Sequence, residues 1–292
     1  ELVAAQANAG CLGIIPAASF SSKEALKQEI RKCRSLSDKP FAVNVALFPT
    51  MRPFSVDEMI EAAHEEGVRI IETSGRSPEP YMKLIKQPGV VHMHKCARVR
   101  DAVKAEKLGA DIVTIVGFEC GGHPSAEQVT TFVIVPKTVD SVRIPVLAGG
   151  GIADGRGLVA ALALGAEGVV IGTRFLATKE CPIHDRFKEA ILTADVADTA
   201  LLLLSHGAPF RAYRNELAKK VLELEARGAE LGEILNLVSG LRQLESYQAG
   251  DVNGGSWPLG QAAGLIREIK TVKEVVEEIM DEAQQVSQRI RL

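Results

Sequence analysis

The sequence predicts an α/β protein built as a TIM (β/α)8 barrel, with a helical insertion before its last helices. Short apolar segments alternate with helix-forming segments, roughly every 22 to 32 residues, as parallel βαβ units require. Two neighbouring strands end in glycine-rich turns, Gly149-Gly150-Gly151 and Gly172-Thr173. The 292 residues, 46% of them hydrophobic, are enough for one barrel with an added segment. An open doubly wound sheet is the alternative.

The predicted strands are short apolar runs that stop at glycine, proline or polar residues. Seven can be identified, at 12–15, 41–47, 68–72, 90–95, 111–116, 144–148 and 168–171. A closed barrel of this type has eight strands. Because the chain opens in a helical segment, 1–9, which should follow a strand, we expect the first barrel strand to lie upstream of Glu1.

Helix-start and helix-stop signals separate these strands. Ser55 is expected to cap a helix over 56–66 that ends at Gly67, and Asp154 occupies the N-cap position before 158–164. Further helices are predicted up to Cys33, around 81–86, and over 98–108.

The alternation stops at residue 181, which divides the chain into three parts. We predict a β/α barrel over 1–180 (strands 2–8), a helical lid over 181–250, and a site-covering loop with closing helices over 251–292. The lid is expected to contain helices at 183–192, 199–204, 215–227 and 231–246, and the closing helices are expected at 260–269 and 272–290. The loop 251–259 is polar and glycine-rich, as loops that cover sites often are.

Charge and composition exclude several classes of partner. A net charge of −3 and 4% aromatic residues give no footprint for nucleic acid or for an anionic membrane surface. No apolar run reaches membrane-spanning length. Five scattered cysteines without a C-x-x-C pair indicate free thiols in a reducing compartment. We therefore expect a cytoplasmic protein that acts on a small molecule, as a monomer or homodimer.

The two glycine turns predict a phosphate site. Backbone N–H groups of Gly149, Gly150, Gly151, Gly172 and Thr173 converge at the carboxyl ends of two strands, where a helix N-terminus adds partial positive charge. In β/α barrels such sites commonly follow the seventh and eighth strands. The alternative is that these glycines only form tight βα turns.

His123 is the candidate catalytic residue. It follows two glycines at the end of a barrel strand, on the face where such barrels place their chemistry, and imidazole accepts a proton at neutral pH. The alternative is a loop histidine hydrogen-bonded to backbone. That class is expected for the other five histidines, which are His64, His92, His94, His184 and His206. No ligand spacing indicates a metal, so we predict none.

Two further polar residues lie within or at the end of apolar strands. Lys95 could face a phosphate, a flavin ring or a carboxylate, or form a salt bridge inside the barrel mouth. Asn44 needs a partner inside its strand, either a ligand ring or a backbone group. Glu72, Thr73 and Glu119 are further polar positions at strand ends.

Four segments together resemble one known family. They are G-F-E-C-G-G-H, A-G-G-G-I-A-D-G-R-G, G-A-E-G-V-V-I-G-T-R-F and W-P-L-G-Q-A-A-G-L-I. They are similar to the FMN-dependent nitronate monooxygenase (2-nitropropane dioxygenase) superfamily across nearly the whole chain. This superfamily also contains a flavin enoyl-ACP reductase and an NADH:quinone reductase branch. The run G-F-E-C-G-G-H-P, followed by F-L-A-T-K-E-C-P-I-H, resembles the quinone reductase branch most.

The resemblance implies FMN at the carboxyl end of the barrel. Family phosphate-binding positions match Gly150, Gly151, Gly172 and Thr173, next to Gly149 and Ile171. Positions that approach the flavin match Asn44, Lys95, Gly121 and Gly122, and the position of His123 holds the base near flavin N5. The family's first strand, P-I-x-Q-G-x-M, has no counterpart in this sequence.

The resemblance leaves several functions open. We expect oxidation of alkyl nitronates with O2 to a carbonyl compound and nitrite. The alternative is an NAD(P)H:quinone reductase with NADH or NADPH as a substrate. An enoyl-ACP reductase is third, because the sequence shows no clear basic cluster for an acidic carrier protein. A barrel that only binds FMN or phosphate is the non-enzyme alternative.

Overall fold

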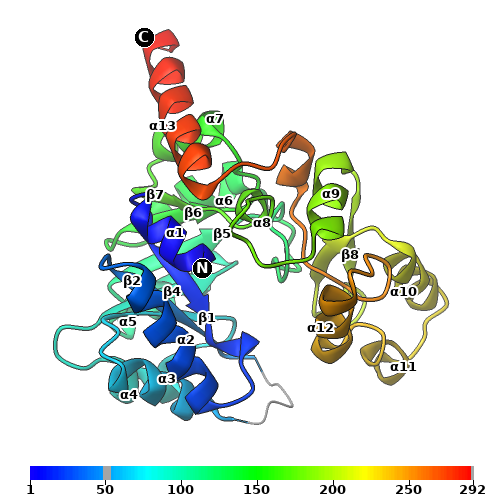
Figure 1. Ribbon diagram of the computed structural model, residues 1–292, viewed down its shortest axis with the longest axis horizontal. Helices are drawn as coiled ribbons and strands as arrows, with labels where there is room; N and C mark the ends of the chain where they lie inside the picture. Colours follow the sequence, from blue (N-terminus) through cyan, green and yellow to red (C-terminus); the bar gives the residue numbers. More distant parts are fainter. Residues whose placement is uncertain (49–53, 291–292) are drawn as a thin grey trace.

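The computed structural model describes residues 1–48 and 54–290 and contains one parallel sheet of seven strands (Figure 1). The strand order follows the chain, β1 to β7, and every neighbouring pair is parallel. The strands are β1 (Gly13–Pro16), β2 (Phe41–Ala46), β3 (Ile70–Ser74), β4 (Val91–Cys96), β5 (Ile112–Val116), β6 (Val146–Gly149) and β7 (Gly168–Val170). All seven predicted strands are therefore confirmed, with ends shifted by one or two residues. Doubly wound sheets reverse their strand order at a switch point, so this sequential order rules out that alternative.

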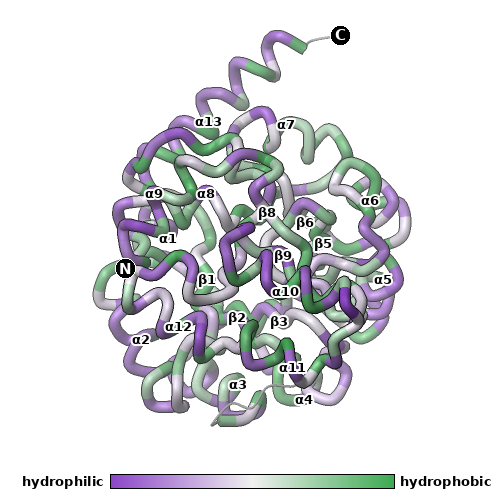
Figure 2. The backbone as a smooth tube through the Cα atoms, turned by 90° about the vertical axis from the view of Figure 1, so that its right-hand side faces the viewer, coloured by the Kyte–Doolittle hydropathy of each residue, from purple (hydrophilic) through white to green (hydrophobic). Residues whose placement is uncertain are grey.

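The sheet is curled. Figure 2 shows the strands following one another along an arc, with β8 and β9 of the later segment in front of them. This shape is part of a β/α barrel, in agreement with the predicted fold class. Because all strands are parallel, their carboxyl ends meet at one edge and gather the loops that follow them.

Helices follow the strands as βαβ units require. They are α1 (Leu2–Asn8), α2 (Lys23–Leu36), α3 (Val56–Glu65), α4 (Met82–Ile85), α5 (Val99–Lys107), α6 (Thr131–Val139), α7 (Gly155–Ala163) and α8 (Thr173–Leu176). Both predicted N-caps are confirmed. Ser55 forms a capping box with Glu58, and Asp154 accepts hydrogen bonds from the first turn of α7.

Helix α6 was not predicted from its sequence, T-F-V-I-V-P-K-T-V. Its β-branched residues favour strands, and Pro136 inside it removes a helix hydrogen bond. Burial of Ile134 and Val135 against the sheet supports the helix despite these preferences. Tertiary packing thus overrides local propensity here.

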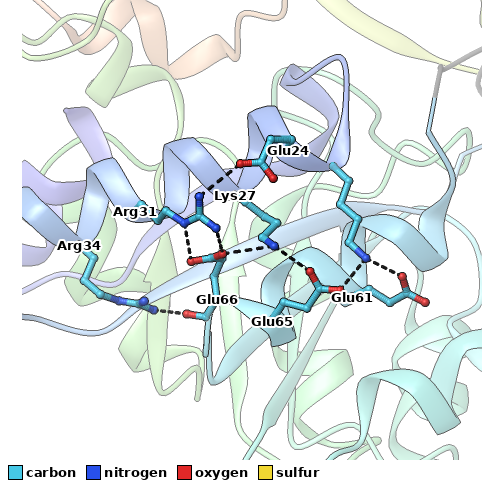
Figure 3. A network of polar contacts seen from close by, with 8 residues as sticks. Glu24, Lys27, Arg31, Arg34, Glu61, Glu65 and Glu66 are labelled. Carbon is cyan, nitrogen blue, oxygen red and sulfur yellow. Dashed lines mark hydrogen bonds and ion pairs between the residues drawn. The ribbon is translucent and has the colours of Figure 1, made fainter.

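The core lies between the sheet and the helices. Around α2 and α3 it contains fully buried Ile30, Ile60 and Ile71. The outer faces of these two helices are joined by ion pairs, including Lys27 with Glu65 at 2.9 Å and Arg31 with Glu66 at 2.7 Å (Figure 3). Such surface pairs contribute little individually, so the apolar core carries this packing.

The segment 181–250 is not purely helical. It contains α9 (Asp185–Thr193), an antiparallel pair formed by β8 (Thr199–Leu202) and β9 (Phe210–Tyr213), then α10 (Glu216–Ala226), α11 (Leu231–Leu235) and α12 (Gly240–Ala249). The helix predicted at 199–204 is wrong, because a short apolar run is compatible with either structure and here pairs with β9. The helix predicted at 231–246 is divided in two, with Ser239 capping α12.

The last part of the chain returns to the sheet. A loop leads to the short 3-10 helix η3 (Gln261–Leu265), where a longer helix over 260–269 was predicted, and the chain ends in α13 (Val272–Arg289). Helix α13 packs closely on α7, because Gly155 allows its backbone to approach Ile279 and Ala283. Among the described residues, no helix has the length and apolarity needed to cross a bilayer.

Candidate functional site

His123 lies between two aromatic rings. Its ring centroid is 4.8 Å from that of Phe48, just after β2, and 5.0 Å from that of Phe210 on β9. Neighbouring protein atoms desolvate the imidazole and lower the pKa of His123, although the residue as a whole is exposed to solvent. Desolvation disfavours the imidazolium, so His123 is neutral at pH 7 and its ring nitrogen can accept a proton.

The loop that carries His123 is paired with β9. Gly122 and Arg211 exchange two backbone hydrogen bonds, with N–O distances of 3.0 and 2.6 Å. Phe48, Phe210 and Arg211 were not identified from the sequence as part of this site. No local pattern marks them, because Phe48 on one side and Phe210 and Arg211 on the other are far from His123 in the sequence.

Asn44 and Lys95 converge on a buried carboxylate. Glu72 is fully buried and accepts hydrogen bonds from Asn44 Nδ2 at 2.6 Å and from Lys95 Nζ at 2.9 Å. The strand register explains these contacts. Asn44 lies opposite Glu72, and Lys95 lies opposite Ser74, which is two residues after Glu72 and on the same face of β3. Lys95 thus forms the salt bridge that the sequence left open, while Glu72 Oε1 has no partner among the described residues.

The first glycine turn is shaped partly by packing. Gly150 and Gly151 have φ values of +94° and +76°, which other residues rarely adopt. A Cβ on Gly150 would lie 3.1 Å from the backbone N and O of Gly117. Gly149 is buried, and its carbonyl accepts a hydrogen bond from Gly117 N. The tight-turn interpretation therefore accounts for part of this glycine run.

The N-terminus of α7 is not available to a phosphate. Asp154 Oδ1 accepts hydrogen bonds from the backbone N–H groups of Arg156 and Gly157, and Glu282 accepts one from Gly155 N. Both groups that cap this end are carboxylates, which would repel an anion. The expected contribution of a helix N-terminus after the first turn is therefore wrong for α7.

The second turn is open. A Cβ on Gly172 would meet no atom within 4 Å. Among the residues that the structure describes, no hydrogen-bond acceptor faces the backbone N–H groups of Gly151, Gly172 and Thr173. Ile171, which precedes this turn, packs partly into the core. Free amides beside unfilled space are what a phosphate requires, so the turn at Gly172 fits one, whereas a Cβ on Gly151 would lie 3.4 Å from Glu119 Cβ.

Gly121 and Gly122 differ in what they contact. A Cβ on Gly121 would lie 2.8 Å from Gly260 N, so this glycine permits close packing of the loop 251–260, called the late loop below. A Cβ on Gly122 would meet nothing within 4 Å, but its φ of +83° favours glycine. Thr173 Oγ1 accepts a hydrogen bond from Gly260 N at 3.0 Å, which links the late loop to the second turn as well.

The remaining polar candidates have structural partners. Glu119 accepts hydrogen bonds from the backbone N and the hydroxyl of Thr131 at the start of α6. His92 and His94 contact the Thr73 hydroxyl at 2.8 and 2.9 Å, rather than backbone. Within residues 1–48 and 54–290, no group of three or more His, Cys, Asp or Glu side chains could hold a metal ion.

A cavity of about 510 Å³ opens beside Phe48. Its lining includes His94 and three basic side chains, Arg76, Arg98 and Lys104. Arg98 is paired with Asp101 at 2.6 Å, and Lys104 with Glu79 at 2.6 Å. The sequence showed no basic cluster because these residues come from separate loops and a helix.

Comparison with known proteins identifies the family. The nitronate monooxygenase family model matches residues 1–282. The chain belongs to this family. A probable nitronate monooxygenase of Staphylococcus saprophyticus is 31% identical, and the alignment covers 99% of this chain and 92% of that protein. The recognised resemblance is thereby confirmed.

Other relatives carry different names. A 5-hydroxy-7a-methyl-1-oxo-octahydro-1H-indene-4-carboxyl-CoA dehydrogenase of Rhodococcus jostii is 35% identical over 88% of this chain and 68% of its own length. The solved structure of FabK from Thermotoga maritima is 38% identical, with a TM-score of 0.92, covering 99% of this chain and 90% of that one. The nitroalkane oxidase of Streptomyces ansochromogenes is 25% identical, with a TM-score of 0.84, covering 99% and 93%. Family members therefore share an oxidoreductase fold but differ in substrate.

Proposed function

We propose that this protein is an FMN-dependent oxidoreductase that oxidises alkyl nitronates with O2 to a carbonyl compound and nitrite. The observation that carries the proposal is His123, in the loop after β5 between two aromatic rings, because a base there can form the nitronate from a nitroalkane. Relatives named probable nitronate monooxygenase and nitroalkane oxidase support this choice.

Different residues of the site would hold the phosphate and the flavin ring of FMN. The free amides of Gly151, Gly172 and Thr173, with Gly150 beside them, would hold the phosphate. Asn44 and Lys95, fixed by Glu72, would contact the flavin ring. When bound, FMN supplies the redox chemistry, and the protein orients and tunes it.

His123 would extend the reaction to neutral nitroalkanes. Its ring nitrogen takes the proton from the carbon next to the nitro group, and the C–H electron pair moves onto the nitro group to give the nitronate anion. Phe48 and Phe210, whose rings flank the imidazole, would hold it in place for this step. A preformed nitronate needs no such proton removal.

A second candidate is reduction of an acyl thioester by NADH or NADPH. It is favoured by the similarity to FabK and to the CoA dehydrogenase. The cavity beside Phe48 adds Arg76, Arg98 and Lys104, which would suit a phosphate-bearing substrate. The carboxylates that already pair with Arg98 and Lys104 make this the weaker candidate.

Anaerobic stopped-flow absorbance tests the proposal. FMN-loaded protein is mixed separately with propyl-2-nitronate, with NADH and with NADPH, and after NADH with crotonyl-CoA or with a quinone. We expect the flavin absorbance to change rapidly with nitronate alone. Bleaching by NADH or NADPH without any response to nitronate would overturn the proposal. Reoxidation by crotonyl-CoA would then identify the thioester reductase, and reoxidation by a quinone would identify the quinone reductase.

We further infer how the sheet is completed. In the described part of the chain, β1 and β7 each pair on one side. An eighth strand between them, the first of a closed barrel, would pair with both and add backbone groups to the FMN site. We also propose that the chain has three parts, a barrel over 1–180, a lid over 181–250, and a site-covering loop with closing helices over 251–292.

A further inference from the structure

Arg211 holds the loop of His123 with its side chain. The side chain is 3% exposed. Nε donates a hydrogen bond to the Phe118 carbonyl at 3.1 Å, and the guanidinium carbon lies 4.4 Å from the centre of the Phe118 ring. Nη1 donates to Thr199 Oγ1 at 2.9 Å, which ties the arginine to β8.

The backbone of Arg211 holds the other end of the same loop. Its N–H and carbonyl both pair with Gly122, the residue directly before His123. One residue therefore fixes the chain at Phe118 and at Gly122. The next residue back along β9, Phe210, contacts the His123 ring itself.

Burying this arginine is costly. Among the described residues, Arg211 donates to a carbonyl and a hydroxyl and not to a carboxylate, and its Nη2 is buried without a hydrogen-bond partner. A buried, unpaired guanidinium destabilises a fold more than a neutral side chain of similar size would. A planar guanidinium, however, donates hydrogen bonds in fixed directions, and here it joins the Phe118 carbonyl to Thr199.

We propose that Arg211 is a positioning residue for His123. It fixes residues 118–122 so that the imidazole stays between Phe48 and Phe210, oriented toward the substrate carbon. The strand pair β8–β9 is then part of the catalytic apparatus and not only a cover. This inference rests on the proposed role of His123.

Two substrates separate positioning from general damage. Arg211→Met is compared with the unchanged protein on neutral nitroethane, which needs proton removal, and on preformed ethyl nitronate, which does not. We expect kcat/KM for nitroethane to fall about 10- to 100-fold, as a misplaced base implies. For the nitronate we expect kcat/KM to change less than about threefold, because this substrate needs no proton removal. General damage to the fold would instead lower kcat/KM for both substrates alike.

A second measurement does not depend on turnover. In protein labelled with 15N-histidine, the ring signals of His123 are assigned by their loss in His123→Gln. We expect Arg211→Met to shift or broaden them, while FMN titration gives an unchanged Kd. Thr199→Val removes only the Nη1 acceptor, so it should shift the same signals less, and it remains informative if the methionine variant fails to fold.

Arg242→Met is the control at an exposed arginine. Arg242, on α12, also donates through Nε to a backbone carbonyl, that of Gly254, at 2.6 Å. It does not contact the loop 118–122, so neither the substrate ratio nor the His123 signals should change.

The outcomes distinguish the two proposals. If Arg211→Met lowers kcat/KM equally for nitroethane and ethyl nitronate, the positioning role is wrong. It is also wrong if the NMR signals of His123 do not change. If His123→Gln fails to lower nitroethane turnover selectively, the catalytic role of His123 itself is wrong. A selective loss in His123→Gln without one in Arg211→Met overturns only the inference on Arg211.

Discussion

Glycines in the two site turns are required for different reasons. Gly150 has a left-handed backbone and lies against the backbone of Gly117, so its role is at least partly structural. Gly172 has φ −107° and unfilled space where a Cβ would be, so none of the residues that the structure describes requires glycine there. A bound phosphate close to the Gly172 backbone would explain it.

Substitution by alanine separates these two roles. Gly172→Ala should change the free energy of unfolding by less than about 0.5 kcal/mol. It should weaken FMN binding about tenfold, because the added methyl group competes with the phosphate. Gly150→Ala should lower the free energy of unfolding by about 1–3 kcal/mol through backbone strain. Urea unfolding of the flavin-free proteins and FMN fluorescence titration measure both effects. Unchanged FMN affinity in Gly172→Ala would rule out a phosphate at this turn.

Single residues could be predicted where chemistry and position coincide. His123 follows a strand and two glycines, and the structure places it at the carboxyl edge beside two aromatic rings. Its neighbours Phe48 and Phe210 could not be predicted, because contacts between distant segments leave no local pattern. Arg211 could not be predicted for the same reason.

Two adjacent strands share a buried polar contact outside the site. The Thr73 hydroxyl on β3 lies between His92 and His94 of β4, and all three side chains are buried. Burial lowers the pKa of each histidine to about 4. For His92 the positive charges of His94 and Lys86 act in the same direction, while Asp111 opposes them.

This pair should make stability depend on pH between about 6.5 and 4. The unfolded chain binds protons on these histidines below about 6.5 and the folded chain does not, so stability falls as the pH falls through this window. On the order of 2–2.5 kcal/mol should be lost from each histidine by pH 4.5, or about 4–5 kcal/mol from the pair. Urea unfolding at several pH values measures the slope, and His92→Gln with His94→Gln should flatten it. An equal slope in both proteins would show that the histidines are protonated in the fold. Carboxylate titration lies mainly below this window.

Elements could be predicted wherever local signals and packing agreed. The seven strands and the capped helices α3 and α7 have clear boundaries in the sequence. Helix α6 was not predicted, because its sequence is rich in β-branched residues, and strand β8 was predicted as a helix, because its run is rich in leucine. In both segments, contacts with another part of the chain decide the structure.

Across the whole molecule, the late loop joins the curled sheet at two glycines. Gly121 and Gly260 pack backbone against backbone, and Gln261 N donates to the Glu119 carbonyl at 3.0 Å. Gly260 N reaches Thr173 at the second turn. This junction therefore connects the loop of His123 with the proposed phosphate turn, although the two are far apart in sequence.

A methyl group at Gly121 should open this junction. Its Cβ would lie 2.8 Å from Gly260 N and 2.9 Å from the Leu259 carbonyl carbon, so the late loop must move. We expect Gly121→Ala to lower the free energy of unfolding by about 1–3 kcal/mol, as overpacking does, and to speed amide hydrogen exchange at Gly260 and Gln261. Gly232→Ala, at an open position in α11, is the control and should cost nothing. Unchanged stability and exchange, together with weaker FMN binding, would instead mean that Gly121 is glycine to admit the flavin. The measurement thus decides whether this glycine serves the protein's own packing or its ligand.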